Sequence, residues 1–147
     1  MRRILIIDDD LDMCQLLSQF LQRKGFETET AHTGHKGLEK FNESKFDLVL
    51  CDFRLGDMDG RKVLQKIKSI NPDVIVIIIT GYSDVKMAVE VMRYGAFDYI
   101  TKPLIPEELI NLINKGLDDS PPLIKADATN ISIPKSSAGK YFTIDPE

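Results

Sequence analysis

The sequence predicts an α/β fold in which a parallel sheet of five strands alternates with five helices. Two observations carry this prediction. Runs of consecutive apolar residues, which are typical of strands buried on both faces, occur at 4–7, 48–51 and 74–79, and the mixed segments 26–31 and 97–101 also predict strands. Between these runs the apolar residues recur at the three- and four-residue spacing of a helix. With 147 residues, 43% of them hydrophobic, the chain can form one domain with a sizeable core but not two.

The five predicted strands lie within roughly the first hundred residues. They span Ile4–Ile7, Phe26–Ala31, Asp47–Cys51, Val74–Ile79 and Phe97–Thr101. Because connections between parallel strands are almost always right-handed, few topologies remain. We expect a doubly wound sheet of order 2-1-3-4-5 with helices on both faces. Its functional site should lie where the carboxyl ends of the first and third strands meet.

Capping and breaking residues bound the predicted helices. The first helix carries an apolar stripe at helical spacing, comprising Leu11, Cys14, Leu17 and Leu21 and widened by Leu16 and Phe20. Further boundary signals are Gly25 after the first helix, Thr33 before the second, Asn71-Pro72 after the third, Gly95 after the fourth, and Pro106 and Gly116 at the two ends of the fifth. These signals predict where each helix begins or ends.

The fourth predicted helix has apolar residues on two sides. One set is expected to pack on the sheet and comprises Val85, Ala88, Val89 and Met92. The other set, Met87, Val91 and Tyr94, is expected to be exposed and to form a contact surface for a partner or a second copy. The alternative, that these are scattered surface residues without a partner, stays open.

The composition and periodicity of the sequence change near Asp118. Residues 118–147 include Ser120-Pro121-Pro122 and a Ser, Lys and Gly run at 135–140 and have no helical period, which predicts a linker after a domain of residues 1–117. This segment has neither a glycine-rich phosphate loop nor a helix-turn-helix pattern. We therefore expect it to lead to an effector domain that this chain does not contain.

The net charge and the hydropathy of the chain argue against several classes of function and location. A net charge of −4 argues against broad binding to nucleic-acid phosphates by this domain. The apolar run 74–79 is too short to span a bilayer, and Asp8–Asp10 interrupts the first apolar run, which argues against a signal peptide. Cys14 and Cys51 form no motif and are expected to be reduced core thiols, so a cytoplasmic location is expected.

Acidic residues cluster at the predicted site. Asp8 and Asp9 follow the first strand and Asp52 follows the third, so the three carboxylates should converge. Two carboxylates about 4 Å apart repel by roughly 4 kcal/mol at an effective dielectric constant near 20. Such a cluster calls for a hard divalent cation with oxygen ligands, and Mg²⁺, which also binds phosphate oxygens, is expected.

The remaining strand ends add complementary groups. Lys102 follows the fifth strand and offers an ammonium that can pair with a carboxylate or a phosphoryl oxygen. Thr80 follows the fourth strand and offers a hydroxyl. Together with the acidic cluster, these groups predict phosphoryl transfer to an aspartate carboxylate.

These strand ends carry a resemblance to a known family. The motifs are Ile7-Asp8-Asp9-Asp10, the segment from Leu50 to Gly60 that contains Asp52, Ile78-Ile79-Thr80-Gly81, and Asp98-Tyr99-Ile100-Thr101-Lys102-Pro103. In this order, over about residues 3–117, the sequence resembles the receiver domains of two-component response regulators, whose fold is flavodoxin-like. The segment Val85–Tyr99 is particularly similar to receivers of sigma-54-dependent, NtrC-type transcriptional activators.

The resemblance implies a role for each matched residue. Asp52 would be the phosphoacceptor, and Lys102 would hold the phosphoryl group. The Mg²⁺ ligands would be Asp9, Asp52 and the backbone carbonyl of Arg54, with Asp8 acting through water. Thr80 and Tyr99 would be the residues that move on activation. Leu55-Gly56 stands where relatives often have Met-Pro or Leu-Pro, which loosens the loop after Asp52 without removing a reacting group.

The resemblance also implies a signalling switch and not an enzyme, apart from assistance to its own phosphorylation and dephosphorylation. A sensor histidine kinase or a small phosphodonor would supply the phosphoryl group. The face formed by the fourth helix, fifth strand and fifth helix would then control a transcriptional effector, with a homodimer as one outcome.

Two other functions stay open. A pseudo-receiver would bind partners without phosphorylation, although Asp9, Asp52, Thr80 and Lys102 are all present. A Mg²⁺-dependent phosphatase with an aspartyl nucleophile would place a second acid two residues after Asp52, where this chain has Arg54.

Overall fold

The computed structural model describes residues 1–81 and 85–119, and these residues form the predicted α/β fold. The elements are β1 (Arg3–Ile7), α1 (Leu11–Arg23), β2 (Glu27–Ala31), α2 (Gly34–Glu43), β3 (Leu48–Asp52), α3 (Gly60–Ile70), β4 (Ile75–Thr80), α4 (Val85–Arg93), β5 (Asp98–Thr101) and α5 (Pro106–Asp119). The strands pair in parallel in the order β2-β1-β3-β4-β5, which confirms the predicted topology.

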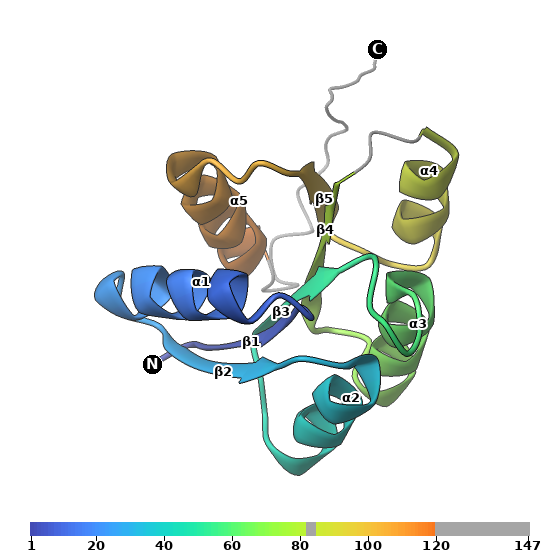
Figure 1. Cartoon of the computed structure of the whole chain (residues 1–147), viewed down its shortest axis with the longest axis horizontal. Helices are drawn as coiled ribbons and strands as arrows, with labels where there is room; N and C mark the ends of the chain where they lie inside the picture. The colour runs from blue at the N-terminus through green and yellow to red at the C-terminus, as the bar shows by residue number, and fades with distance from the viewer. Residues whose placement is uncertain (82–84, 120–147) are drawn as a thin grey trace. The chain divides into compact units, whose positions relative to one another are not determined.

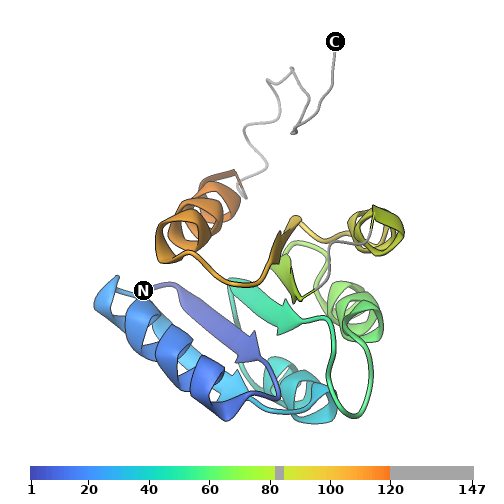
Figure 2. The same cartoon turned by 45° about the horizontal axis from the view of Figure 1, so that its top comes forward.

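The helices cover the sheet on both faces, with α1 and α5 on one side and α2, α3 and α4 on the other (Figures 1 and 2). Alternate residues of each strand point to opposite faces, so the sheet contributes side chains to two hydrophobic cores, one on each face. In β1, for example, Ile4 and Ile6 join the core that contains Leu17, whereas Leu5 and Ile7 join the core that contains Val63. This two-sided burial explains why β1, β3 and β4 are almost continuously apolar.

The first helix buries a narrower stripe than the sequence suggests. Cys14, Leu17 and Leu21 are buried, but the side chains of Leu11 and Leu16 are 61% and 64% exposed. The apolar residues of α1 extend around more of the helix than the sheet covers, so these two leucines lie at the surface. The helix is capped by Asp10, whose side chain accepts a hydrogen bond from the Met13 backbone N–H.

The face assignment predicted for α4 was wrong. Met87 and Val91 are 6% and 0% exposed and pack into the core, whereas Val85 and Val89 are 79% and 50% exposed. Apolar residues lie on both sides of this nine-residue helix, so the pattern alone did not identify the side that meets the sheet. Met87 and Val91 therefore cannot form an exposed interface in this arrangement. Tyr94 remains 38% exposed.

The end of α5 differs from its prediction. The helix continues through Gly116 to Asp119, because Gly116 packs against the sheet: a Cβ there would lie 2.9 Å from Ile75 Cγ2. The linker predicted for residues 118–147 lies outside the described residues from position 120 onward and stays a prediction. Among residues 1–81 and 85–119, no helix has the length and apolar character that a membrane span requires.

The contact between α2 and β1 should be sensitive to a single methyl group. A Cβ on Gly37 would lie 2.4 Å from Cδ1 of Ile7, a fully buried side chain with little room to move. We expect Gly37→Ala to lower the free energy of unfolding by about 1–3 kcal/mol, although alanine is the better helix former. Chemical denaturation would measure this loss. Gly56→Ala is the matched control, because a Cβ at Gly56 would meet no atom within 4 Å.

Candidate functional site

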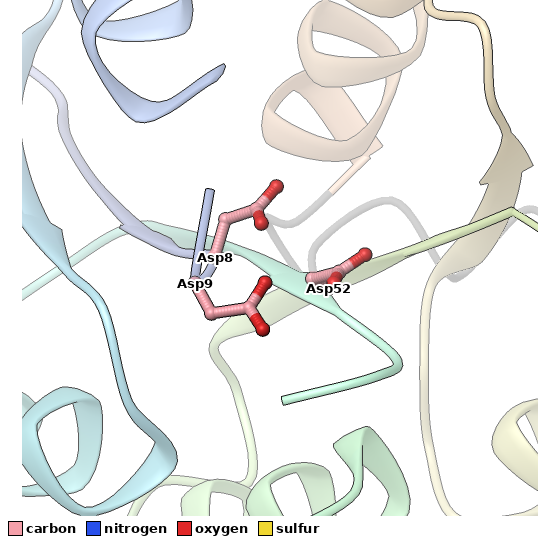
Figure 3. A group of neighbouring side chains, drawn as sticks. All are labelled: Asp8, Asp9 and Asp52. Carbon is pink, nitrogen blue, oxygen red and sulfur yellow. The ribbon is translucent and has the colours of Figure 1, made fainter. Parts of the chain in front are cut away.

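The candidate site lies at the edge of the sheet where the parallel strands present their carboxyl ends. Asp52 ends β3 and Thr80 ends β4, while Asp8 and Lys102 directly follow β1 and β5. The side chains of Asp8, Asp9 and Asp52 lie close together (Figure 3). One carboxylate oxygen from each of the three residues lies within 4.8 Å of the others. The structure therefore shows the convergence that the strand order predicts.

Burial distinguishes the three carboxylates. Asp8 and Asp52 are 1% and 5% exposed, whereas Asp9 is open to solvent. Asp8 Oδ1 accepts a hydrogen bond from the Asp10 backbone N–H at 3.0 Å. Asp8 Oδ2 is buried and has no hydrogen-bond partner among residues 1–81 and 85–119. Buried polar atoms are rarely left unpaired, so this oxygen indicates that the pocket is built for a further positive or hydrogen-bonding group.

Lys102 forms ion pairs with two acids of this cluster. Its Nζ lies 3.3 Å from Asp52 Oδ1 and 3.8 Å from Asp8 Oδ2. Although partial burial acts to lower it, the charges of Asp52 and Asp8 hold the pKa of Lys102 above its ordinary value. Lys102 carries one positive charge and the cluster holds three carboxylates, so this lysine alone does not balance their negative charge.

The pKa values of the two buried acids, Asp52 and Asp8, are both raised, mainly by burial. Burial, reinforced by the charge of Asp8, raises the pKa of Asp52 to about 6 even though Lys102 acts to lower it. Burial likewise raises the pKa of Asp8, against the hydrogen bond from Asp10 and the charge of Lys102. Both acids are therefore held in a site that disfavours their ionised forms.

The residues present fit a hard divalent cation. All three groups of the cluster are carboxylates, which are the ligands that Mg²⁺ prefers, and Asp8 Oδ2 accepts no hydrogen bond from the described residues, although Lys102 Nζ lies 3.8 Å away. A cation bound there would reduce the repulsion among the three carboxylates and would also interact with Asp8 Oδ2.

The loop after Asp52, residues 53–59, is closed by backbone contacts. The Phe53 N–H donates to the Ile79 carbonyl at 2.7 Å, and the Gly60 N–H donates to the Phe53 carbonyl at 2.7 Å. Arg54 and Asp59 form an isolated antiparallel bridge. A Cβ on Gly60 would lie 2.9 Å from Phe53 Cα, so glycine permits this close approach. The backbone of Arg54 is thus part of a tightly closed turn beside the acidic cluster.

The predicted switch residues are placed on adjoining strands. Thr80 is buried at the end of β4, and its carbonyl accepts a hydrogen bond at 2.8 Å from the Lys102 N–H. Tyr99 lies on β5 and is 37% exposed. The register pairs Ile78 with Tyr99 and Thr80 with Thr101, so both predicted residues belong to one strand pair.

Some contacts near the site had no signal in the sequence. Asp57, in the loop after β3, accepts hydrogen bonds from the start of α2 and lies 2.6 Å from His35 Nδ1. Arg61 of α3 pairs with Glu90 of α4 and with Asp59. Asp57 and His35 are 22 residues apart, and Arg61 and Glu90 are 29 residues apart. Only the packed fold brings these pairs together.

Comparison with known proteins decides the family. Residues 4–114 match the response regulator receiver domain family. This chain belongs to that family. The receiver is 37% identical over 141 residues to the transcriptional regulatory protein ZraR of Salmonella typhimurium, a match that covers 96% of this chain and 31% of ZraR. The receiver thus spans about a third of the length of this curated relative.

Solved structures agree with this assignment. A CheY-like receiver domain protein from Methanospirillum hungatei superimposes with a TM-score of 0.80 at 37% identity, covering 82% of this receiver and 96% of that chain. The beryllofluoride-activated receiver domain dimer of NtrC4 gives a TM-score of 0.78 at 31% identity, covering 82% and 99%. The resemblance to receivers of NtrC-type regulators is therefore confirmed.

Proposed function

We propose that this receiver is a phosphoryl-accepting signalling switch in which Asp52 is the acceptor. The observation that carries the proposal is the buried Asp52 carboxylate, which lies 3.3 Å from Lys102 Nζ beside the acidic cluster. The phosphoryl group would come from a sensor histidine kinase or a small phosphodonor. Apart from assisting its own phosphorylation and dephosphorylation, the domain would act as a switch and not as an enzyme.

In the proposed reaction an Asp52 carboxylate oxygen attacks the phosphorus of the donor. A new O–P bond forms, the bond from phosphorus to the donor breaks, and the leaving atom keeps the electron pair. The product is an acyl phosphate on Asp52. Because its pKa is about 6, the carboxyl group is largely ionised, and therefore nucleophilic, at neutral pH. Lys102, already beside Asp52, would then pair with a phosphoryl oxygen.

The acidic cluster would hold Mg²⁺ through Asp9, Asp52 and the backbone carbonyl of Arg54, with Asp8 acting through water. When bound, Mg²⁺ would neutralise charge on the phosphoryl oxygens during transfer. Asp8 would also keep a buried negative charge next to the acceptor, Asp52.

The signal would leave the site through Thr80 and Tyr99. The Thr80 hydroxyl would move toward the new phosphoryl group, and Tyr99 on the paired strand would change its exposure. The receiving surface would be the face of α4, β5 and α5, where Tyr94 is exposed and where Val85 and Val89 replace the buried Met87 and Val91 as candidate contacts. We propose a cytoplasmic protein whose effector, reached through residues 118–147, controls transcription, with a phosphorylation-dependent homodimer and no nucleic-acid contact by the receiver itself.

The experiment that tests the proposal is intact-protein mass spectrometry with a small-molecule phosphodonor. We expect a gain of one phosphoryl group that requires Mg²⁺ and disappears in Asp52→Asn. The control Asp73→Asn changes an exposed aspartate in the turn before β4 and should behave as the wild-type protein. A folded wild-type protein that neither gains phosphoryl nor binds beryllofluoride would favour a phosphorylation-independent interaction module instead.

A further inference from the structure

The loop after the proposed acceptor is fastened to the neighbouring helix by one carboxylate. Asp57 Oδ1 accepts a hydrogen bond from the Gly34 N–H at 2.8 Å, and Asp57 Oδ2 accepts one from the His35 N–H at 2.9 Å. His35 Nδ1 lies 2.6 Å from the same Oδ2. The carboxylate thus binds two of the backbone N–H groups that open α2 and have no partner within the helix.

The loop also packs closely on the same turn of α2. A Cβ on Gly34 would lie 2.5 Å from Cγ of Met58, the residue after Asp57. Two successive loop residues, Asp57 and Met58, therefore contact the start of α2. Only a residue without a side chain at position 34 permits this approach.

The titration of Asp57 agrees with this geometry. Although burial acts to raise it, hydrogen bonds from Gly34 and His35 lower the pKa of Asp57 to about 2. The carboxylate therefore stays ionised over the physiological pH range, and its hydrogen bonds are charge-assisted.

The loop needs such a restraint because of the residue that precedes Asp57. Leu55 is buried in the core, but Gly56, which follows it, has wide backbone freedom, and a Cβ there would meet no atom within 4 Å. On the far side of Gly56 lies Arg54, whose backbone carbonyl is a proposed Mg²⁺ ligand. The bridge between Arg54 and Asp59 and the contacts of Asp57 with α2 together fix the loop on both sides of Gly56.

We propose that Asp57 is a positioning residue for phosphoryl transfer: by fastening the loop to α2 it holds the Arg54 carbonyl where the acidic cluster can share a divalent cation with it. This inference rests on the proposed function. Asp57 would touch neither the cation nor the phosphoryl group. Its contribution would appear in the affinity for Mg²⁺ and not in the rate once Mg²⁺ is saturating.

The experiment compares Asp57→Ala, Asp57→Asn and His35→Ala with the wild-type receiver. The Mg²⁺ concentration for half-maximal phosphorylation is measured with a small phosphodonor, and Mg²⁺ binding is measured directly by calorimetry. Partners that orient metal ligands are typically worth 10- to 100-fold in affinity, so we expect Asp57→Ala to raise the Mg²⁺ requirement about tenfold. The rate at saturating Mg²⁺ should stay within about twofold of wild type, as expected for a lost ground-state binding contribution.

The smaller changes should form a graded series. Asp57→Asn keeps one acceptor oxygen and should show a smaller increase, and His35→Ala removes only the exposed imidazole and should show the smallest. Glu43→Gln is the charge control, since it removes one negative charge from the exposed far end of α2. Charge loss that distant is largely screened at moderate salt, so Glu43→Gln should leave the Mg²⁺ requirement unchanged.

The outcomes separate the two proposals. If the wild-type receiver gains no phosphoryl group, the proposed function fails, and the calorimetric Mg²⁺ affinities still test the part played by Asp57. If the wild type is phosphorylated but Asp57→Asn and His35→Ala have the Mg²⁺ affinity of Glu43→Gln, the positioning role is overturned. The same holds if folded Asp57 variants lose rate at saturating Mg²⁺ without any change in Mg²⁺ requirement. Thermal unfolding of each variant verifies that it is folded.

Discussion

Asp52→Asn should raise the free energy of unfolding by about 3 kcal/mol near pH 7.5 in Mg²⁺-free buffer, and by less than about 1 kcal/mol at pH 4. In the folded receiver the pKa of Asp52 is raised from 3.8 to about 6, mainly by burial and then by the charge of Asp8. Between these two values the unfolded chain binds fewer protons than the folded protein. The stability of the wild type therefore falls as pH rises from about 4 to about 6 and stays lower above that range.

Chemical denaturation at a series of pH values measures this effect. The control is Asp73→Asn, which changes an exposed aspartate away from the acidic cluster and should shift stability by less than about 0.5 kcal/mol at every pH. Mg²⁺ should stabilise the wild type more than Asp52→Asn, because a ligand that binds only the folded state adds stability by mass action. If Asp52→Asn were the less stable protein near neutral pH, the cluster would not be under electrostatic strain.

Lys102→Met should slow phosphorylation of Asp52 about a hundredfold, the loss expected when one group that stabilises developing charge is removed from a reaction site. The Lys102 ammonium lies 3.3 Å from Asp52 Oδ1 and favours its ionised form. Without it the pKa of Asp52 should rise further, so the pH at which phosphorylation reaches half its maximum should also move upward.

The rate of phosphoryl gain, followed by mass spectrometry across pH, tests both effects of this substitution. Lys66→Met removes an exposed positive charge from α3 and serves as the control. A Lys102→Met protein that is phosphorylated at the rate of Lys66→Met, with the same pH profile, would show that Lys102 has no part in the transfer.

Much of the fold was predictable because its signals are local. The continuous apolar runs identify strands buried on both faces, and handedness then limits their order. Asp8, Asp52, Thr80 and Lys102 were placed together by a simple geometric rule, since the carboxyl ends of parallel strands share one edge. The convergence of Asp8 and Asp52 could therefore be predicted from the strand order without knowing the loop conformations.

The errors arose where the local pattern was ambiguous. In α4 both the Met87 and Val91 side and the Val85 and Val89 side are apolar, and helical period alone cannot choose between them. The choice depends on how the helix approaches the sheet: Met87 and Val91 enter the core beside Val63 of α3. The Arg61–Glu90 ion pair joins the same two helices, and it connects residues too far apart in sequence to be anticipated.

The contact of Asp57 with α2 was missed for a similar reason. A sequence pattern assigns Asp57 to a turn and His35 to an exposed first helical turn, and each assignment is locally adequate. His35 is indeed mostly exposed, yet its ring nitrogen lies 2.6 Å from the Asp57 carboxylate. Such links between a loop and a distant helix start follow from tertiary packing and not from propensity.

The central claim is that Asp52 carries the phosphoryl group, and chemical trapping tests it most directly. The receiver would be incubated with a small phosphodonor and Mg²⁺ and then treated with borohydride, which reduces an aspartyl phosphate to homoserine. Peptide mass spectrometry would locate the change. We expect homoserine at position 52 alone, and none when Mg²⁺ is chelated. Homoserine at Asp8 or Asp9, or a stable phosphoryl group elsewhere with position 52 unmodified, would contradict it.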